Sequence, residues 1–136
     1  HYFRPLPVGR QFIAEPVERK SPGWPDPDPD CMEFLASRKV MTLGTDSASM
    51  GPLPDLAEPT HYAGLKHGMI WTESATGLGQ LPVTGAFYCM MGPKHKDGPY
   101  GEGRAFAVVG DPLALQLINS ARKNRAVDLT VTLAID

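Results

Sequence analysis

Prolines and glycines interrupt this chain so often that long helices and strands are excluded over most of it. The 136 residues include 14 Pro and 14 Gly. Proline lacks the backbone donor that a helix interior or a central strand needs, and glycine marks turns. The densest cluster, SPGWPDPDPD at 21–30, ends a Pro-rich segment, residues 1–30, in which we expect extended or turn conformation and no helix. The remaining residues are expected to form short elements joined by many loops.

Composition places the chain among ordinary globular proteins of one domain's length. Its mass is 14.7 kDa and 42% of its residues are hydrophobic, which is enough for a single core. The net charge is −2 and the sequence has no basic cluster, so a nucleic acid is not an expected partner. No apolar run approaches the roughly 20 residues of a membrane span. We therefore expect no membrane partner, and a cytoplasmic location is the default.

Neither the cysteines nor the first residues indicate secretion. Cys31 and Cys89 do not make a disulfide framework, and both lie in apolar contexts where free buried thiols are common. The chain opens at HYFRPLPVGR, without an initiator Met or a signal-like stretch. We therefore expect a processed or partial chain.

A helix is predicted directly after the Pro-rich segment. Asp30 is the expected N-cap, and Glu33 completes a capping-box pair with it. The apolar stripe of this helix consists of Met32, Leu35 and Ala36. The run VMTLGTD at 40–46 that follows is short and β-prone, and we expect a strand there that stops at Gly44.

Short helices and strands are predicted to alternate over the rest of the chain. Thr60 is expected to cap a helix that runs through Lys66 and ends at Gly68. Further strands are predicted at 68–73, 83–91 and 103–110, and a helix from Asp111–Pro112 has an apolar side of Leu113, Leu117, Ile118 and Ala121. Residues 127–135 alternate between apolar and polar, which predicts a half-buried strand that must pair with another. This order predicts a mixed α/β architecture.

His61 and Glu73 lie on either side of a predicted helix–turn–strand unit. Because such a unit folds back on itself, the imidazole and the carboxylate can meet, and both suit Zn²⁺ or Mn²⁺. His67, six positions before Glu73, is the competing candidate, although its place before Gly68 also suits an interaction with the end of the helix. A His–Glu pair is also common as a surface or structural pair. Spacing alone leaves these alternatives open.

Asp46 lies just beyond the predicted strand that stops at Gly44, at the position where α/β sites gather, the C-terminal end of a strand. An Asx-type turn is the alternative role for this residue. Ser47 and Ser49 come next, but neither lies in a G-x-S-x-G elbow, so we do not expect a serine hydrolase.

Two further side chains are candidates for substrate binding. Arg104 lies between a Gly-rich loop and a predicted strand, where a guanidinium can hold a carboxylate or a carbonyl, and a structural salt bridge is the alternative. Trp24, in the Pro-rich loop, can line a pocket for a planar ligand or belong to the core.

Taken together, these landmarks resemble the C-terminal half of the metal-dependent cyclase/amidohydrolase family that includes bacterial kynurenine formamidase and isatin hydrolase. The resemblance covers residues 21–109, through SPGW…DCMEFLASRKV, GTDSAS, the spacing of His61 and Glu73, LGQLPVTGAFYCMMGPK and GEGRAFAVV. It implies that His61 and Glu73 are the metal ligands of this half, and that Asp46 and Ser47 border the substrate pocket. It also implies a divalent ion (Mn²⁺ or Zn²⁺), a small-molecule substrate and a cyclase-like fold, which is a swivelling β/β/α mixed sheet with flanking helices.

The sequence also departs from this family. The H-x-G-T-H-x-D-x-P-x-x-H type motif, which supplies the other ligands and the acid/base histidine, is missing, and RAVDLTVTLAID at 125–136 resembles the opening strand that normally precedes it. We therefore predict three segments: 1–30, the Pro-rich segment; 31–110, the C-terminal half of a cyclase-like domain; and 111–136, the start of a further unit. The chain is then a piece of a tandem or permuted precursor, or a subunit. Its fold and metal site are expected to need a complementary chain that carries the N-terminal half motif.

Three hypotheses for function follow. The first is metal-dependent hydrolysis of an amide, lactam or related C–N bond within an oligomer, with Asp46 or Ser47 as proton relay or substrate contact and the general base from the partner chain. The second is a non-catalytic structural or assembly subunit of the same fold. The third is a small-ligand binding module without turnover. Specificity would depend on the loops 21–30 and 92–102 and on the missing segments.

Overall fold

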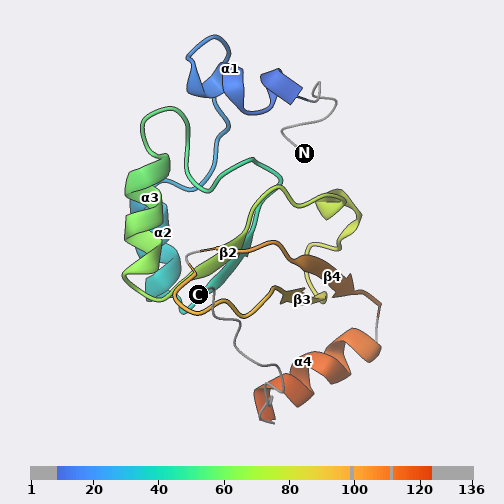
Figure 1. Ribbon diagram of the computed structural model, residues 1–136. Helices are drawn as coiled ribbons and strands as arrows, with labels where there is room; N and C mark the ends of the chain where they lie inside the picture. The colour runs from blue at the N-terminus through green and yellow to red at the C-terminus, as the bar shows by residue number, and fades with distance from the viewer. Residues whose placement is uncertain (1–8, 99, 111, 124–136) are drawn as a thin grey trace. The chain divides into compact units, whose positions relative to one another are not determined.

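The computed structural model describes residues 9–98, 100–110 and 112–123 (Figure 1). The chain divides between Leu78 and Gly79 into two compact units. The first unit contains η1 Gly9–Gln11, α1 Ala14–Val17, α2 Pro29–Ser37, β1 Thr42–Gly44, α3 Ala57–Leu65 and β2 Ile70–Thr72. A 3₁₀ turn, η2 Leu78–Gln80, spans the division, and the second unit contains β3 Phe87–Met91, β4 Arg104–Val108 and α4 Leu113–Lys123. The three segments predicted from the sequence stay a prediction.

The described elements confirm a mixed α/β protein of short pieces. Two small sheets occur with helices, and each predicted strand in this part of the chain is present but shorter than expected. The strand predicted in the run 40–46 ends at Gly44 as expected and spans Thr42–Gly44, and the one at 68–73 spans Ile70–Thr72. None of the helices in the described part of the chain has the length and apolarity that crossing a membrane requires.

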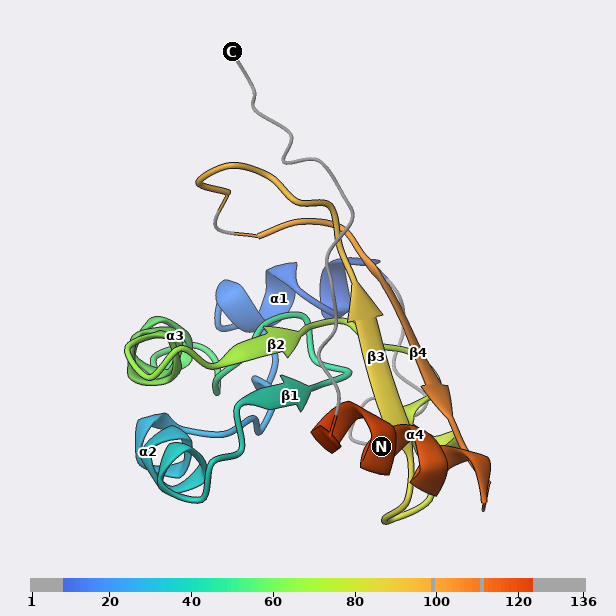
Figure 2. The ribbon, with the colours of Figure 1, turned by 90° about the horizontal axis from the view of Figure 1, so that it is seen from below.

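The sheet of the first unit is a parallel pair, β1 with β2 (Figure 2). Leu43 is opposite Trp71, and Gly44 is opposite Thr72. A parallel pair needs a crossover connection, and α3 lies in the segment that provides it. Because the strands run in the same direction, their C-terminal ends meet at one edge of the sheet, and the residues after Gly44 lie next to those after Thr72.

The core of this unit lies between the helices α2 and α3 and the sheet of β1 and β2. Its buried side chains are Met32, Met50, Ala63 and Met69, with Leu35, Ala36, Leu43 and Trp71 packed against them. The apolar stripe predicted for α2, which consists of Met32, Leu35 and Ala36, is thereby confirmed. Gly64 lets α3 approach closely, since a Cβ at this position would lie 2.6 Å from Met32 Cε and 2.8 Å from Trp71 Cζ3.

The predicted cap of α2 is wrong by two residues. The side chain of Asp28, not Asp30, accepts the N–H of Cys31, at 2.8 Å. Pro29 decides this, because a proline favours the first helical position and the residue before it is held extended. Glu33 forms no capping box, and it pairs instead with Lys66 and His67 at the end of α3.

The predicted cap of α3 is also wrong. The helix begins at Ala57 and no side chain caps it. Thr60 lies inside it, fully buried, and packs against Gly51, where a Cβ would come within 2.8 Å of the Thr60 Cβ. The earlier start adds a turn before His61, so that its ring can bond back to Ala57.

Residues 9–30 contain helical turns that the proline pattern did not predict. Gly9–Gln11 and Ala14–Val17 are each about one turn long. Pro16 is tolerated in α1 because the first turn of a helix needs no backbone donor.

The second unit is built on an antiparallel hairpin. β3 pairs with β4 from Phe87↔Val108 to Met91↔Arg104, and α4 packs against β3. Ala114 is the buried residue of α4 and Leu117 and Ile118 are half-buried, whereas Leu113 and Ala121, predicted on the same side, are exposed. The inward face therefore follows an i, i+3, i+4 pattern from Ala114. The predicted helix start at Asp111 and strand 127–135 lie outside the described residues.

The two candidate caps of α2 can be separated by mutation. Asp28→Ala should lower the free energy of unfolding by about 1 kcal/mol, because the N–H of Cys31 loses its acceptor. Asp30→Ala should be near neutral, since the lost attraction to the helix dipole is offset by the better helix propensity of alanine. Urea denaturation of both variants checks this, and a larger loss in Asp30→Ala would contradict the observed cap.

Candidate functional site

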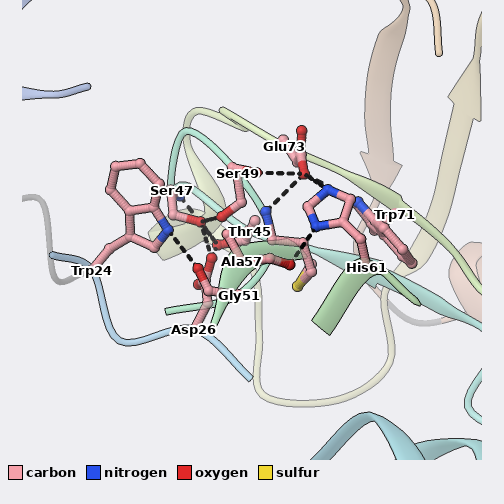
Figure 3. A network of polar contacts seen from close by, with 11 residues as sticks. Trp24, Asp26, Thr45, Ser47, Ser49, Gly51, Ala57, His61, Trp71 and Glu73 are labelled. Carbon is pink, nitrogen blue, oxygen red and sulfur yellow. Dashed lines mark hydrogen bonds and ion pairs between the residues drawn. The ribbon is translucent and has the colours of Figure 1, made fainter. Parts of the chain in front are cut away.

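The C-terminal ends of β1 and β2 and the middle of α3 bring His61 and Glu73 together (Figure 3). His61 Nε2 lies 3.3 Å from Glu73 Oε1, and the two side chains are 33% and 32% exposed. The alternative histidine, His67, pairs with Glu33 at 2.7 Å instead. Hydrogen bonds from Lys66 and His67 lower the pKa of Glu33. The structure thus places His61, rather than His67, beside Glu73.

The His61 ring has a defined tautomer. Its Nδ1 lies 2.8 Å from the backbone oxygen of Ala57, and since a carbonyl only accepts, Nδ1 carries the proton and donates it. In the neutral ring Nε2 then has a lone pair, which faces the Glu73 carboxylate. An imidazole that donates one N–H to a backbone carbonyl and directs its other nitrogen outward is the usual arrangement of metal-binding histidines.

The Glu73 carboxylate is held through one oxygen. Oε1 accepts the backbone N–H of Met50 at 2.7 Å, the indole N–H of Trp71 at 3.1 Å and the hydroxyl of Ser49 at 3.4 Å. Oε2 has no hydrogen-bond partner among the described residues. The carboxylate is therefore fixed in place and retains one oxygen for a ligand.

The pair fits a divalent ion in ligand type, because an imidazole nitrogen and a carboxylate oxygen are both common ligands of Zn²⁺. The 3.3 Å between Nε2 and Oε1 shows that the carboxylate lies directly beside the imidazole. Within residues 9–98, 100–110 and 112–123, no group of three or more His, Cys, Asp or Glu side chains is arranged to hold a metal. An ion held by this pair would thus have at most two His, Cys, Asp or Glu ligands from the described residues.

A second polar network lies on the other side of the loop that follows β1. Asp26 Oδ1 accepts the hydroxyl of Thr45 at 2.9 Å, and its other oxygen accepts the hydroxyl of Ser47. The two hydroxyl oxygens are 2.7 Å apart, and Ser47 is 1% exposed. With its hydroxyl in this network and near the backbone oxygen of Ser49, Ser47 fixes the loop 45–50.

Burial raises the pKa of Asp26 above the ordinary value of 3.8. The hydrogen bonds from Ser47 and Thr45 act in the opposite direction, because they stabilise the charged form. The nearby charge of Asp46 adds to the upward shift.

The loop 45–50 connects the two networks. Its Thr45–Ser47 end binds Asp26, and its Ser49–Met50 end binds Glu73. The chain after β2 is bonded to the same loop, since Ser74 N–H donates to the Ser47 oxygen at 2.7 Å. Asp26 and Glu73 are therefore bonded to the same six-residue loop, so that displacing either carboxylate would also displace the loop.

The remaining candidates lie in different surroundings. Asp46 is half-buried in the loop after β1, beside Ser47. Trp24 is 2% exposed, and its indole N–H donates to the Gly51 oxygen at 2.9 Å, so that it occupies a core position. Arg104 belongs to the second unit, where it begins β4 and its side chain is exposed.

Sequence reasoning missed the contributions of Asp26 and of the backbone at Met50. Asp26 is one of three acidic residues that alternate with prolines at 25–30, and nothing local distinguishes it from the other two. The nearby Trp24 was a usable signal, because a tryptophan in a polar, Pro-rich stretch indicates that this stretch packs against the core.

Comparison of the chain with protein-family models, with curated proteins and with solved structures finds no match. The geometry of the site therefore carries the functional argument.

The raised pKa of Asp26 predicts a pH dependence of stability. A carboxyl that binds its proton more tightly in the folded than in the unfolded state loses stability as the pH rises from the unfolded to the folded pKa. The free energy of unfolding of the wild type, minus that of Asp26→Asn, should thus fall as the pH rises above 3.8 and then level off. Urea denaturation between pH 3 and pH 7 (roughly the range that brackets a carboxyl titration) checks this, and a difference that rises with pH would contradict it.

Proposed function

We propose that this chain supplies part of the active site of a metal-dependent hydrolase that cleaves an amide, lactam or related C–N bond. One observation carries the proposal: the Nε2 of His61, in a ring whose tautomer is set by Ala57, lies 3.3 Å from the carboxylate of Glu73. The pair stands at the C-terminal ends of two parallel strands, where α/β enzymes place their chemistry. The resemblance of residues 21–109 to the cyclase/amidohydrolase family adds the reaction class and a cyclase-like fold.

His61 and Glu73 would hold the ion, Zn²⁺ or Mn²⁺, through Nε2 and through the carboxylate. A divalent ion at such a site lowers the pKa of a bound water and polarises a carbonyl. Asp46, half-buried within the loop 45–50 that supports the pair, is our candidate for substrate contact or proton transfer. Ser47 has a nearly inaccessible hydroxyl, so we assign it the role of holding this loop.

A complementary chain or segment would complete the site. Two protein ligands are too few for a stable tetrahedral centre, and no third one accompanies the pair in the described residues. The parallel sheet is also small, since each strand is three residues long and isolated pairs of strands are marginally stable. A partner that carries the N-terminal half motif would supply the missing ligands, the general base and further strands, which makes an oligomer the expected active form.

A second function is favoured by a different observation. Glu73 Oε1 accepts two N–H groups and so joins the loop 45–50 to β2. This bonding is sufficient reason for a carboxylate at position 73 in a non-catalytic structural or assembly subunit of the same fold. In the hydrolase, Oε2 would bind the metal ion, whereas in the structural subunit Oε2 would bind no ion.

The metal assignment can be tested on the chain itself with Mn²⁺, because two protein ligands still bind the ion weakly and its paramagnetism makes weak binding visible by NMR. Titration should broaden the NMR signals of His61, Glu73 and their neighbours at low Mn²⁺ concentration. Glu73→Gln should abolish this broadening, because the glutamine oxygen can still accept the N–H of Met50 while the ligand oxygen is replaced by an amide nitrogen.

The matched control is His67→Ala, which removes a histidine that pairs with Glu33 and not with Glu73. It should leave the Mn²⁺ effect unchanged. Equal broadening in Glu73→Gln, or none in the wild type, would exclude the metal site and leave the structural role.

A further inference from the structure

The indole of Trp71 touches both members of the His61–Glu73 pair. Its Nε1–H donates to Glu73 Oε1 at 3.1 Å, and its ring meets the His61 ring edge-on, with centroids 5.1 Å apart and planes at 85° (Figure 3). It is the residue before Thr72 at the end of β2, opposite Leu43. One rigid side chain therefore contacts the two candidate ligands, which come from different elements.

The position of the indole is itself tightly set. Trp71 packs against the core cluster, and Gly64 of α3 leaves room for its ring, since a Cβ there would lie 2.8 Å from Cζ3. A tryptophan has only two side-chain torsions, so a ring packed in this way has little freedom. The backbone pairing of β2 with β1 fixes its other end.

The two tryptophans of this unit use their indole N–H groups differently. Trp24 donates to a backbone oxygen, that of Gly51, which is the ordinary way to satisfy a buried indole. Trp71 donates to the carboxylate that would bind the ion. An N–H on a ligating carboxylate fixes which oxygen is free, and such outer contacts are a large part of metal affinity.

From these contacts we infer that Trp71 is a positioning residue, which holds the His61 imidazole and the Glu73 carboxylate side by side and leaves Oε2 for a divalent ion. It acts on Glu73 through Nε1–H and on His61 through the edge-to-face contact of the two rings. The inference rests on the proposed function and assigns no contact between Trp71 and the ion or the substrate.

The test uses the full chain, Mn²⁺ as the probe and the variant Trp71→Phe, which keeps a ring in the core but removes the indole N–H. Loss of an outer contact to a metal ligand typically weakens affinity about 10–100-fold, and we expect a loss in that range. Trp24→Phe is the matched control, because it removes the other indole N–H of the same unit. Its Mn²⁺ affinity should stay within about twofold of the wild type.

A second readout does not depend on metal. In Glu73→Gln the indole N–H of Trp71 loses its charged acceptor, so its proton signal should shift while that of Trp24 stays in place. An indole N–H that does not donate to Glu73, such as that of Trp24, would not respond to the charge at position 73.

The outcomes separate the two proposals. If the wild type binds no Mn²⁺, the proposed function fails, and the indole shift then shows only whether Trp71 holds the Glu73 carboxylate. If the wild type binds Mn²⁺ but Trp71→Phe binds it equally well, or if Trp24→Phe is weakened as much, the inference on Trp71 is overturned while the metal site stands. An unmoved Trp71 signal in Glu73→Gln also overturns it.

Discussion

The hydrogen-bonded pairing of β1 with β2 is the constraint on which the first unit depends. Because the strands are parallel and in register from Thr42↔Ile70 to Gly44↔Thr72, the chain leaves both at the same edge. The contacts of Glu73 follow from this arrangement. The loop 45–50, which follows β1, binds Glu73, which follows β2, and α3, which connects the two strands, places His61 beside the same carboxylate. A slip by one residue would send Trp71 to the other face of the sheet.

Polar bonding at this edge is unusually dense for a unit with so small a core. The four buried side chains of the core cluster include three methionines, which are adaptable and define a shape less strictly than branched residues do. The conformation of this unit is defined instead by hydrogen bonds, those of Asp26 with two hydroxyls and those of Glu73 with two N–H groups. The same bonds that give the loop its conformation also fix the groups available for chemistry.

Local patterns in the sequence predicted the class of fold and the stripe of α2, because periodic burial depends only on residues that are close along the chain. The His61–Glu73 pair was also within reach, since one helix–turn–strand unit contains both. The start of α2 was within reach as well, because Pro29 favours the first helical position and so makes Asp28, rather than Asp30, the cap. The role of Asp26 was not, since its partners at 45 and 47 are near only after the strands have paired.

The hydrogen bonds to Glu73 all end on one of its two oxygens, Oε1, and this would affect which ion the proposed site binds. With Oε1 occupied by N–H donors, the carboxylate can offer a cation one oxygen and not two. Ca²⁺ takes six to eight oxygen ligands and often binds a carboxylate through both oxygens. A carboxylate that offers one oxygen, next to an imidazole nitrogen, therefore suits Ca²⁺ poorly. Smaller ions of the first transition row accept a nitrogen and a single carboxylate oxygen, so the backbone N–H of Met50, by occupying Oε1, would favour such an ion at the proposed site.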